Sequence, residues 1–167
     1  MHFCNLLKVS AVEKVRNYAG HTLLNIFEFL SLGERNDIAI ELIRALEMQN
    51  YQFTKYIPDY LGRLLLYLRP TELDEIIDDF EEKIKQSNTQ IVFLLLKTTG
   101  ICIEHYSKYK DRFKEDEKIY EKRLYRLLGI LLSGMSSYDK EIKTESFRIL
   151  GSQVFNSNNL LLIEKNH

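Results

Sequence analysis

Hydrophobic residues recur along this chain with the spacing of amphipathic α-helices. Within residues 71–86, for example, Leu73, Ile77, Phe80 and Ile84 follow steps of four, three and four residues. This spacing places apolar side chains on one face of a helix, and that face is buried against neighbouring elements. The sequence therefore predicts an all-α protein with seven helices, at about residues 12–30, 36–49, 53–68, 71–86, 88–106, 117–134 and 139–156.

The apolar positions also recur from one pair of helices to the next. The chain advances 38 residues from Val15 to Phe53, 38 from Phe53 to Ile91 and 51 from Ile91 to Ile142. Positions 4, 8 and 12 residues after each of these references are mostly apolar. A constant offset favours a repeat of helix pairs over a plain helical bundle. We expect repeat units at about residues 12–30, 36–68, 71–106 and 117–156.

Two further features of the repeat predict details of the structure, a recurring glycine and a longer third interval. Glycine stands nine residues after three references, at Gly62, Gly100 and Gly151. Because glycine has no Cβ, we expect a second helix to approach closely at these positions. The third interval, from Ile91 to Ile142, is longer than the other two, and its extra residues lie at 108–118. These residues are charged and of mixed sign, so we expect a solvated loop or a helical extension there.

Residues 12–19, Val-Glu-Lys-Val-Arg-Asn-Tyr-Ala, resemble the start of an inner helix in a HEAT repeat, where an acidic residue, Val-Arg and a small residue recur. Thr54, Val92 and Lys143 replace that arginine in the later units. Two helices in about 40 residues also resemble the HEAT and armadillo unit. The resemblance covers nearly the whole chain. It implies a right-handed, HEAT-like α-solenoid of about seven antiparallel helices in two layers, in which residues 1–167 are one domain cut from a longer array.

Composition narrows the setting of this helical domain. The chain is 45% hydrophobic and 28% charged, with a net charge of −1, which argues against general attraction to nucleic acid or anionic membrane. Cys4 and Cys102 lie in apolar surroundings outside any metal motif, as expected of free thiols in a reducing compartment. The longest internal apolar run, Ile91 to Leu96, is too short to span a bilayer. We expect a cytoplasmic protein without membrane contact.

No motif in the sequence predicts catalysis. Zinc-binding spacings, phosphate-binding glycine loops and nucleophile elbows are all absent from the 167 residues. Glu104 and His105 form a lone adjacent pair, which is weak evidence for a ligand site. The carboxylates of residues 71–86 fit the solvated outer face of an amphipathic helix better than a cation or acid–base site. We therefore expect no catalytic residue, no metal, no cofactor and no enzymatic activity.

The remaining candidate is the concave face formed by the first, third, fifth and seventh helices. Positions two, six and ten residues after each reference would project from this face, where four cations stand against Asp59 alone. A mildly basic groove suits an acidic peptide or partner domain, although ordinary surface charge explains these residues equally well. The predicted partner-binding residues are Asn17, His21, Asn25, Lys55, Asp59, Arg63, Phe93, Lys97 and Arg148.

These observations favour a protein-interaction scaffold, and two alternatives stay open. Some HEAT-like proteins resemble DNA-base glycosylases, which implies a nucleic-acid binder, but the net charge and the absence of tryptophan argue against that function. The other alternative is a regulatory helical domain of a larger signalling protein. We also expect that the exposed end helices can pair two copies of the chain as a homodimer.

Overall fold

The structure is a computed structural model that describes residues 13–48, 51–86 and 88–154. In these ranges every regular element is a helix and no strand occurs, which confirms the all-α prediction. Two short elements lie between longer helices, α4 (Tyr51–Thr54) and the 3-10 helix η1 (Leu65–Tyr67), and the π-helix η2 (Leu150–Val154) follows the last α-helix. The seven helices of eight or more residues are α2 (Glu13–Phe27), α3 (Leu32–Leu46), α5 (Ile57–Leu64), α6 (Pro70–Gln86), α7 (Thr89–Phe113), α8 (Glu117–Met135) and α9 (Lys140–Ile149).

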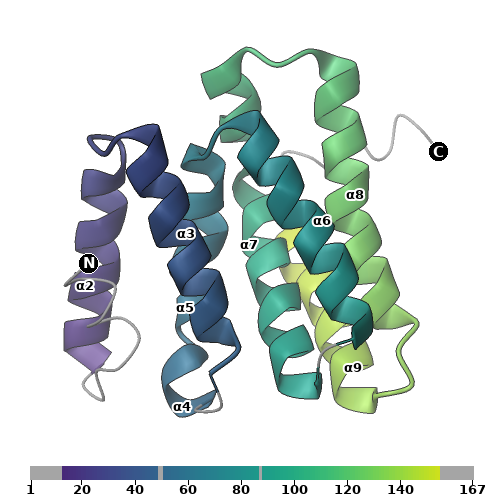
Figure 1. Cartoon of the computed structure of the whole chain (residues 1–167). Coiled ribbons are helices and arrows are strands. Elements are labelled where there is room, and N and C mark those ends of the chain that lie inside the picture. The colour runs from purple at the N-terminus through teal and green to yellow at the C-terminus, as the bar shows by residue number, and fades with distance from the viewer. Residues whose placement is uncertain (1–12, 49–50, 87, 155–167) are drawn as a thin grey trace.

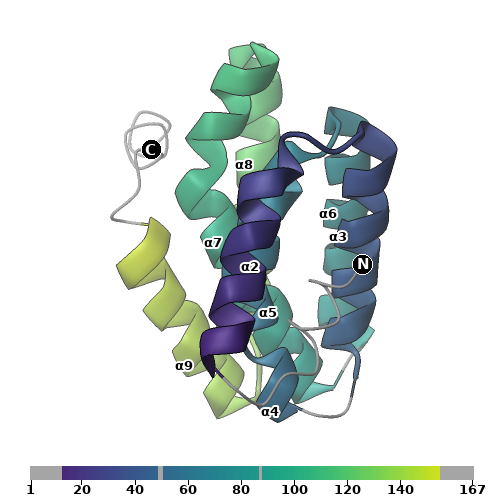
Figure 2. The same ribbon diagram turned by 90° about the vertical axis from the view of Figure 1, so that its left-hand side faces the viewer.

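The helices alternate between two layers along the chain (Figures 1 and 2). One layer is a row in which α5 packs against α2 and α7, and α7 packs against α9. The other layer, in front of this row in Figure 1, contains α3, α6 and α8, with α6 packed on α8. The α5–α7 contact is the most extensive in the described structure. The row α2–α5–α7 is therefore the scaffold for any site on that side.

The repeated apolar positions mostly lie in the core between the layers. The residues four positions after each reference, Ala19, Ile57, Leu95 and Ser146, are each at most 1% exposed. The first reference itself is on the surface, since Val15 is 36% exposed. The prediction that the reference positions are buried was thus wrong near the N-terminal end of α2, where no preceding helix is described. The side chain of Phe53 lies outside the described part of the structure.

Several helix boundaries differ from those predicted from periodicity: the predicted helix 36–49 is Leu32–Leu46, and the α-helical part of 139–156 ends at Ile149. Two further differences affect the side of the molecule formed by α2, α5 and α7. The predicted helix 53–68 is divided among α4, α5 and η1, with Pro58 in the first turn of α5, where its fixed φ and missing N–H are tolerated. The predicted helix 88–106 continues to Phe113, so the charged run from 108 begins as a helical extension. The helix ends at Lys114, which has a left-handed backbone (φ 48°). In this extension Tyr109 is buried and Phe113 packs against the core, while Arg112 reaches Leu66 and Tyr67 of η1.

The expectation of close helix approach at glycine was correct at two of three positions. A Cβ on Gly62 would lie 2.7 Å from Ile101 Cβ and 2.8 Å from the carbonyl oxygen of Thr98. A Cβ on Gly100 would clash with Ile149 and Gln153. At Gly151 the expectation was wrong, because a Cβ there would meet nothing within 4 Å.

The sequence also predicted free cysteine thiols and no membrane-spanning segment. Cys102 is a free, fully buried thiol, and burial raises its pKa to about 12, while Cys4 lies outside the described residues. In the described part of the chain, no helix combines the length and the apolar character that crossing a membrane requires.

Replacing Asp139 by alanine is expected to lower the melting temperature, because Asp139 caps α9. Its carboxylate accepts hydrogen bonds from the backbone N–H groups of Glu141 (2.9 Å) and Ile142 (3.2 Å) and from the Thr89 hydroxyl (3.1 Å). Chiefly the Ile142 bond lowers the pKa of Asp139 below its usual 3.8. The charge-dependent stabilisation is therefore present above pH 3.8 and is lost as the pH falls through the lower folded pKa.

Thermal melts of wild type, Asp139→Ala and Asp139→Asn at pH 7 and at low pH test this role. Asparagine keeps the capping acceptor without the charge, so its difference from wild type should shrink in acid while the alanine variant stays less stable. An alanine variant that melts like wild type at pH 7 would contradict the assigned cap.

Candidate functional site

A hollow of about 300 Å³ opens where α2, η1 and the extended part of α7 meet, next to the end of α5. Three cationic side chains line it, Arg63 from α5 and Lys108 and Arg112 from α7, and no carboxylate does. We call it the basic hollow. Its remaining lining residues are His21, Leu24, Asn25, Leu66, Tyr67 and His105.

The three cations of the basic hollow form no ion pair with any described residue. Arg63 Nε donates a hydrogen bond to the carbonyl oxygen of Asp59 (3.0 Å), and Arg112 Nη1 donates to the carbonyl oxygen of Leu66. These backbone acceptors orient the guanidinium groups without neutralising their charge. Ion pairs within the described residues do occur elsewhere, for example at Arg69, Lys83, Arg123, Arg126 and Arg148.

The wall formed by η1 is held in place by further contacts. The Arg112 guanidinium lies 3.9 Å from the centre of the Tyr67 ring, a cation–π contact. Behind this ring, Arg35 donates hydrogen bonds to the carbonyl oxygens of Leu30 (3.1 Å), Tyr67 (3.2 Å) and Glu28 (2.6 Å). These bonds tie the α2–α3 loop to η1. The η1 side of the hollow, including the Arg112 guanidinium, is therefore preorganised.

A second depression adjoins the basic hollow and shares His21, Arg63 and His105 with it. It has a volume of about 350 Å³ and contains both charge signs, so we call it the mixed groove. The Tyr60 hydroxyl donates to Asn17 Oδ1 across it (3.0 Å). Its other lining residues are Asp59, Ile101, Glu104 and Gln153. The two depressions form one continuous surface along α2, α5 and α7.

His105 lies at the junction of the two depressions. Burial lowers the pKa of His105, the neighbouring Glu104 opposes that change, and Lys108 and Arg63 lower the pKa further. The imidazole is therefore neutral at pH 7 and presents one N–H donor and one acceptor. Arg63 of α5 and Lys108 of α7 line the basic hollow together with this ring.

Five of the nine predicted partner-binding residues meet on this surface: Asn17, His21, Asn25, Asp59 and Arg63. The other four line neither depression. Lys55 and Lys97 each lie 5.0 Å from the centre of a neighbouring aromatic ring, Phe93 packs edge-on to Tyr51, and Arg148 pairs with Glu145. The predicted partner-binding residues that meet on this surface therefore all belong to α2 and α5.

The sequence prediction missed the contribution of α7 to this surface. His105 was set aside with its neighbour Glu104, and Lys108 and Arg112 belong to a run that periodicity left outside a core helix. A detectable signal was present, because Lys97, Ile101 and His105 follow at four-residue steps and Lys108 and Arg112 continue the same helical face. Tyr67 could not be found this way, since it reaches the hollow through a helix break.

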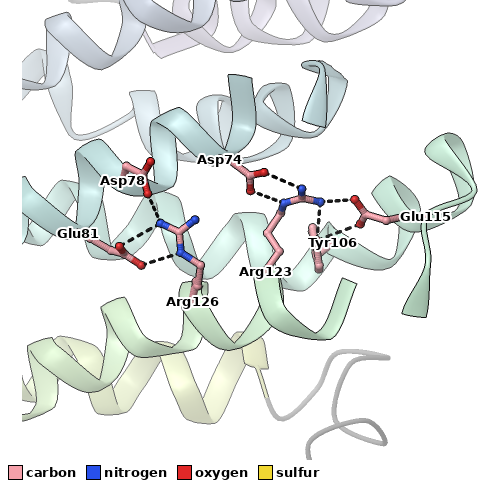
Figure 3. Close-up of polar contacts among 7 residues, drawn as sticks. All are labelled: Asp74, Asp78, Glu81, Tyr106, Glu115, Arg123 and Arg126. Atoms are coloured by element: carbon pink, nitrogen blue, oxygen red, sulfur yellow. Dashed lines mark hydrogen bonds and ion pairs between the residues drawn. The ribbon is translucent and has the colours of Figure 1, made fainter. Parts of the chain in front are cut away.

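The carboxylates of α6 form a different kind of site (Figure 3). Asp74 binds Arg123 of α8, and Asp78 and Glu81 bind Arg126. These three side chains are 42%, 68% and 38% exposed, as the prediction of a solvated face requires, and they also fasten α6 to α8. Their charges are used in ion pairs. Among the described residues no group of three potential metal ligands occurs.

Comparisons with known proteins returned no relative: no family model matches the chain, and neither the curated proteins nor the solved structures contain a significant match. The HEAT resemblance therefore rests on the sequence pattern alone.

Proposed function

We propose that this protein is an interaction module of HEAT-like architecture that binds an acidic segment of a partner protein along α2, α5 and α7. The observation that carries the proposal is the basic hollow, where three cations without ion pairs converge and no carboxylate lines the wall. Unpaired positive charge in a concave, preorganised site favours an anionic ligand. The two-layer alternation of helices and the buried repeat positions support the solenoid part of the proposal.

The shape of the surface favours a peptide over a small isolated anion. The basic hollow and the mixed groove share three residues, so an extended segment lying on one contacts the other. Tyr67 and Leu24, which are half-buried, provide apolar area beside the charges, as peptide-binding grooves do. Charge sets the orientation of such a segment, and the apolar contacts add affinity.

Reversing the charge of the hollow is expected to weaken binding of an acidic peptide by roughly tenfold or more. The test uses a fluorescein-labelled peptide with three consecutive glutamates, and fluorescence polarisation at low salt. Arg63→Glu/Lys108→Glu removes two cations of the hollow whose side chains make no tertiary hydrogen bond. The matched control is Lys140→Glu/Lys143→Glu, which makes the same charge change at exposed positions of α9.

Circular dichroism first establishes that both double variants fold like wild type. Equal affinities of the two variants would reduce the interaction to net charge and contradict a specific groove. A labelled single-stranded DNA forms the second arm of the experiment. DNA binding with a steep salt dependence that exceeds peptide binding would replace the proposal by the nucleic-acid alternative.

A further inference from the structure

We propose that the basic hollow is a phosphate-monoester pocket, and that it takes a phosphoserine or phosphothreonine of the partner segment. This inference rests on the proposed function and specifies the chemistry of its ligand. The adjoining mixed groove then takes a cationic or neutral side chain close to the phosphorylated residue.

The number of positive charges favours phosphate over a carboxylate. Arg63, Lys108 and Arg112 bring three positive charges to one hollow that no carboxylate lines. The nearest acidic groups, Glu28 at the Tyr67 hydroxyl and Asp59 and Glu104 in the mixed groove, form no ion pair with these cations. A glutamate or aspartate carries one negative charge and two acceptor oxygens. A phosphate monoester carries close to two negative charges at pH 7 and three acceptor oxygens, so it matches the three cations more completely.

The hydrogen-bond donors of the hollow are oriented and still available. Arg63 uses Nε for the Asp59 carbonyl and keeps both terminal amino groups, while Arg112 uses one terminal nitrogen for the Leu66 carbonyl. The stacking of Arg112 on Tyr67 at 3.9 Å fixes the plane of its guanidinium. Oriented guanidinium groups recognise phosphate through paired N–H donors, which a freely rotating lysine cannot do.

The size and lining of the hollow fit a single phosphorylated side chain. Its volume of about 300 Å³ is at the small end of ligand pockets. Leu24, which is half-buried, lines it together with the polar groups and offers contact to the Cβ of phosphoserine or the methyl group of phosphothreonine.

The mixed groove argues against a ligand with several phosphates in a row. Asp59 and Glu104 line it, and a second phosphate there would meet two carboxylates. A lysine or arginine near the phosphorylated residue satisfies these acceptors, whereas the phosphate backbone of a nucleic acid is repelled by the two carboxylates.

The test measures three labelled peptides of sequence Ala-Ala-X-Ala-Lys-Ala-Ala, with X as phosphoserine, glutamate or serine, by fluorescence polarisation. We expect phosphoserine to bind at least tenfold more tightly than glutamate, and serine to show no binding. Arg112→Lys keeps the charge but removes the planar donor pair, so it should reduce the preference for phosphoserine over glutamate. Lys140→Glu/Lys143→Glu should leave that preference unchanged.

A fourth peptide tests the mixed groove. It keeps phosphoserine at position X and carries glutamate in place of the lysine, and it should bind the protein more weakly than the phosphoserine peptide with lysine. If glutamate and phosphoserine bind equally, and Arg63→Glu/Lys108→Glu abolishes both, the phosphate pocket is overturned while the acidic-segment proposal stands. If neither peptide binds, both proposals fail. Binding to vesicles containing a phosphoinositide, without binding of the phosphopeptide, overturns the inference in favour of a lipid headgroup.

Discussion

Replacing Arg123 by methionine is expected to lower the free energy of unfolding by about 3–5 kcal/mol, because it leaves a buried carboxylate without its partner. Arg123 is 5% exposed and binds both oxygens of Asp74, through Nε (2.7 Å) and Nη2 (2.9 Å). Its Nη1 donates to Glu115, whose side chain is 6% exposed, and to the Tyr106 hydroxyl (3.4 Å). Burial opposes the charge of Arg123, but these bonds outweigh it and raise the pKa of Arg123. Figure 3 shows this network between α6, α8 and the end of α7.

Urea unfolding of matched variants measures the effect. Arg126→Met removes a neighbouring arginine whose partners Asp78 and Glu81 are 68% and 38% exposed, so its loss should cost about 0–1 kcal/mol. Arg123→Met/Glu115→Gln should recover part of the loss, since it removes the stranded charge as well. Equal effects of Arg123→Met and Arg126→Met would show that burial of the network does not control its contribution.

Enlarging Gly62 is expected to have the second large effect, because α5 and α7 make their closest approach there. The Cβ of an alanine would meet the Cβ and Cγ2 of Ile101 at 2.7 and 2.8 Å, and the Thr98 carbonyl oxygen at 2.8 Å. Neither a branched Cβ nor a helix backbone can rotate away, so the helices must separate. We expect Gly62→Ala to lower the free energy of unfolding by about 1–3 kcal/mol, and Gly62→Leu to lower it further.

Gly129 of α8 provides the matched control. A Cβ there meets nothing within 4 Å, so Gly129→Ala should raise the free energy of unfolding by about 0.5–1 kcal/mol through helix propensity alone. Thermal or urea unfolding of the two alanine variants compares the same chemical change in two environments. A stabilising Gly62→Ala would mean that α5 and α7 are not packed this closely.

Separation of α5 from α7 would also disturb the proposed site. Arg63 is one residue beyond Gly62, and its partners in the basic hollow lie on α7. We expect Gly62→Ala to weaken peptide binding more than its loss of stability explains, because the cations of the hollow move apart. Gly129→Ala lies far from the hollow in sequence and on another helix, so binding should be unchanged.

Sequence periodicity was sufficient to predict the helices because burial of one helical face leaves a local mark. The stripe Leu73, Ile77, Phe80 and Ile84 can be identified without knowing what covers it. The same reasoning identified Gly62 and Gly100 as close contacts. It failed at Val15 and Gly151, where the pattern continues but no described element packs against the residue. A local pattern records what a helix is suited to bury, and only the neighbouring helix decides whether burial occurs.

In the candidate site, too, some residues could be predicted from the sequence and others only from the structure. The sequence by itself determined the all-α class, the apolar faces and five residues of the α2–α5 part of the surface, because these follow from position on a helix. Only the tertiary structure brought Lys108, Arg112 and Tyr67 to that surface, through the extension of α7 and the break at η1. Only the tertiary structure also distinguishes two kinds of arginine. Arg63 and Arg112 make no ion pair with a described residue, whereas Arg123 and Arg126 are paired. The physical reason is that the availability of a charge depends on which opposite charges lie within a few ångströms, and those partners lie on helices distant in sequence.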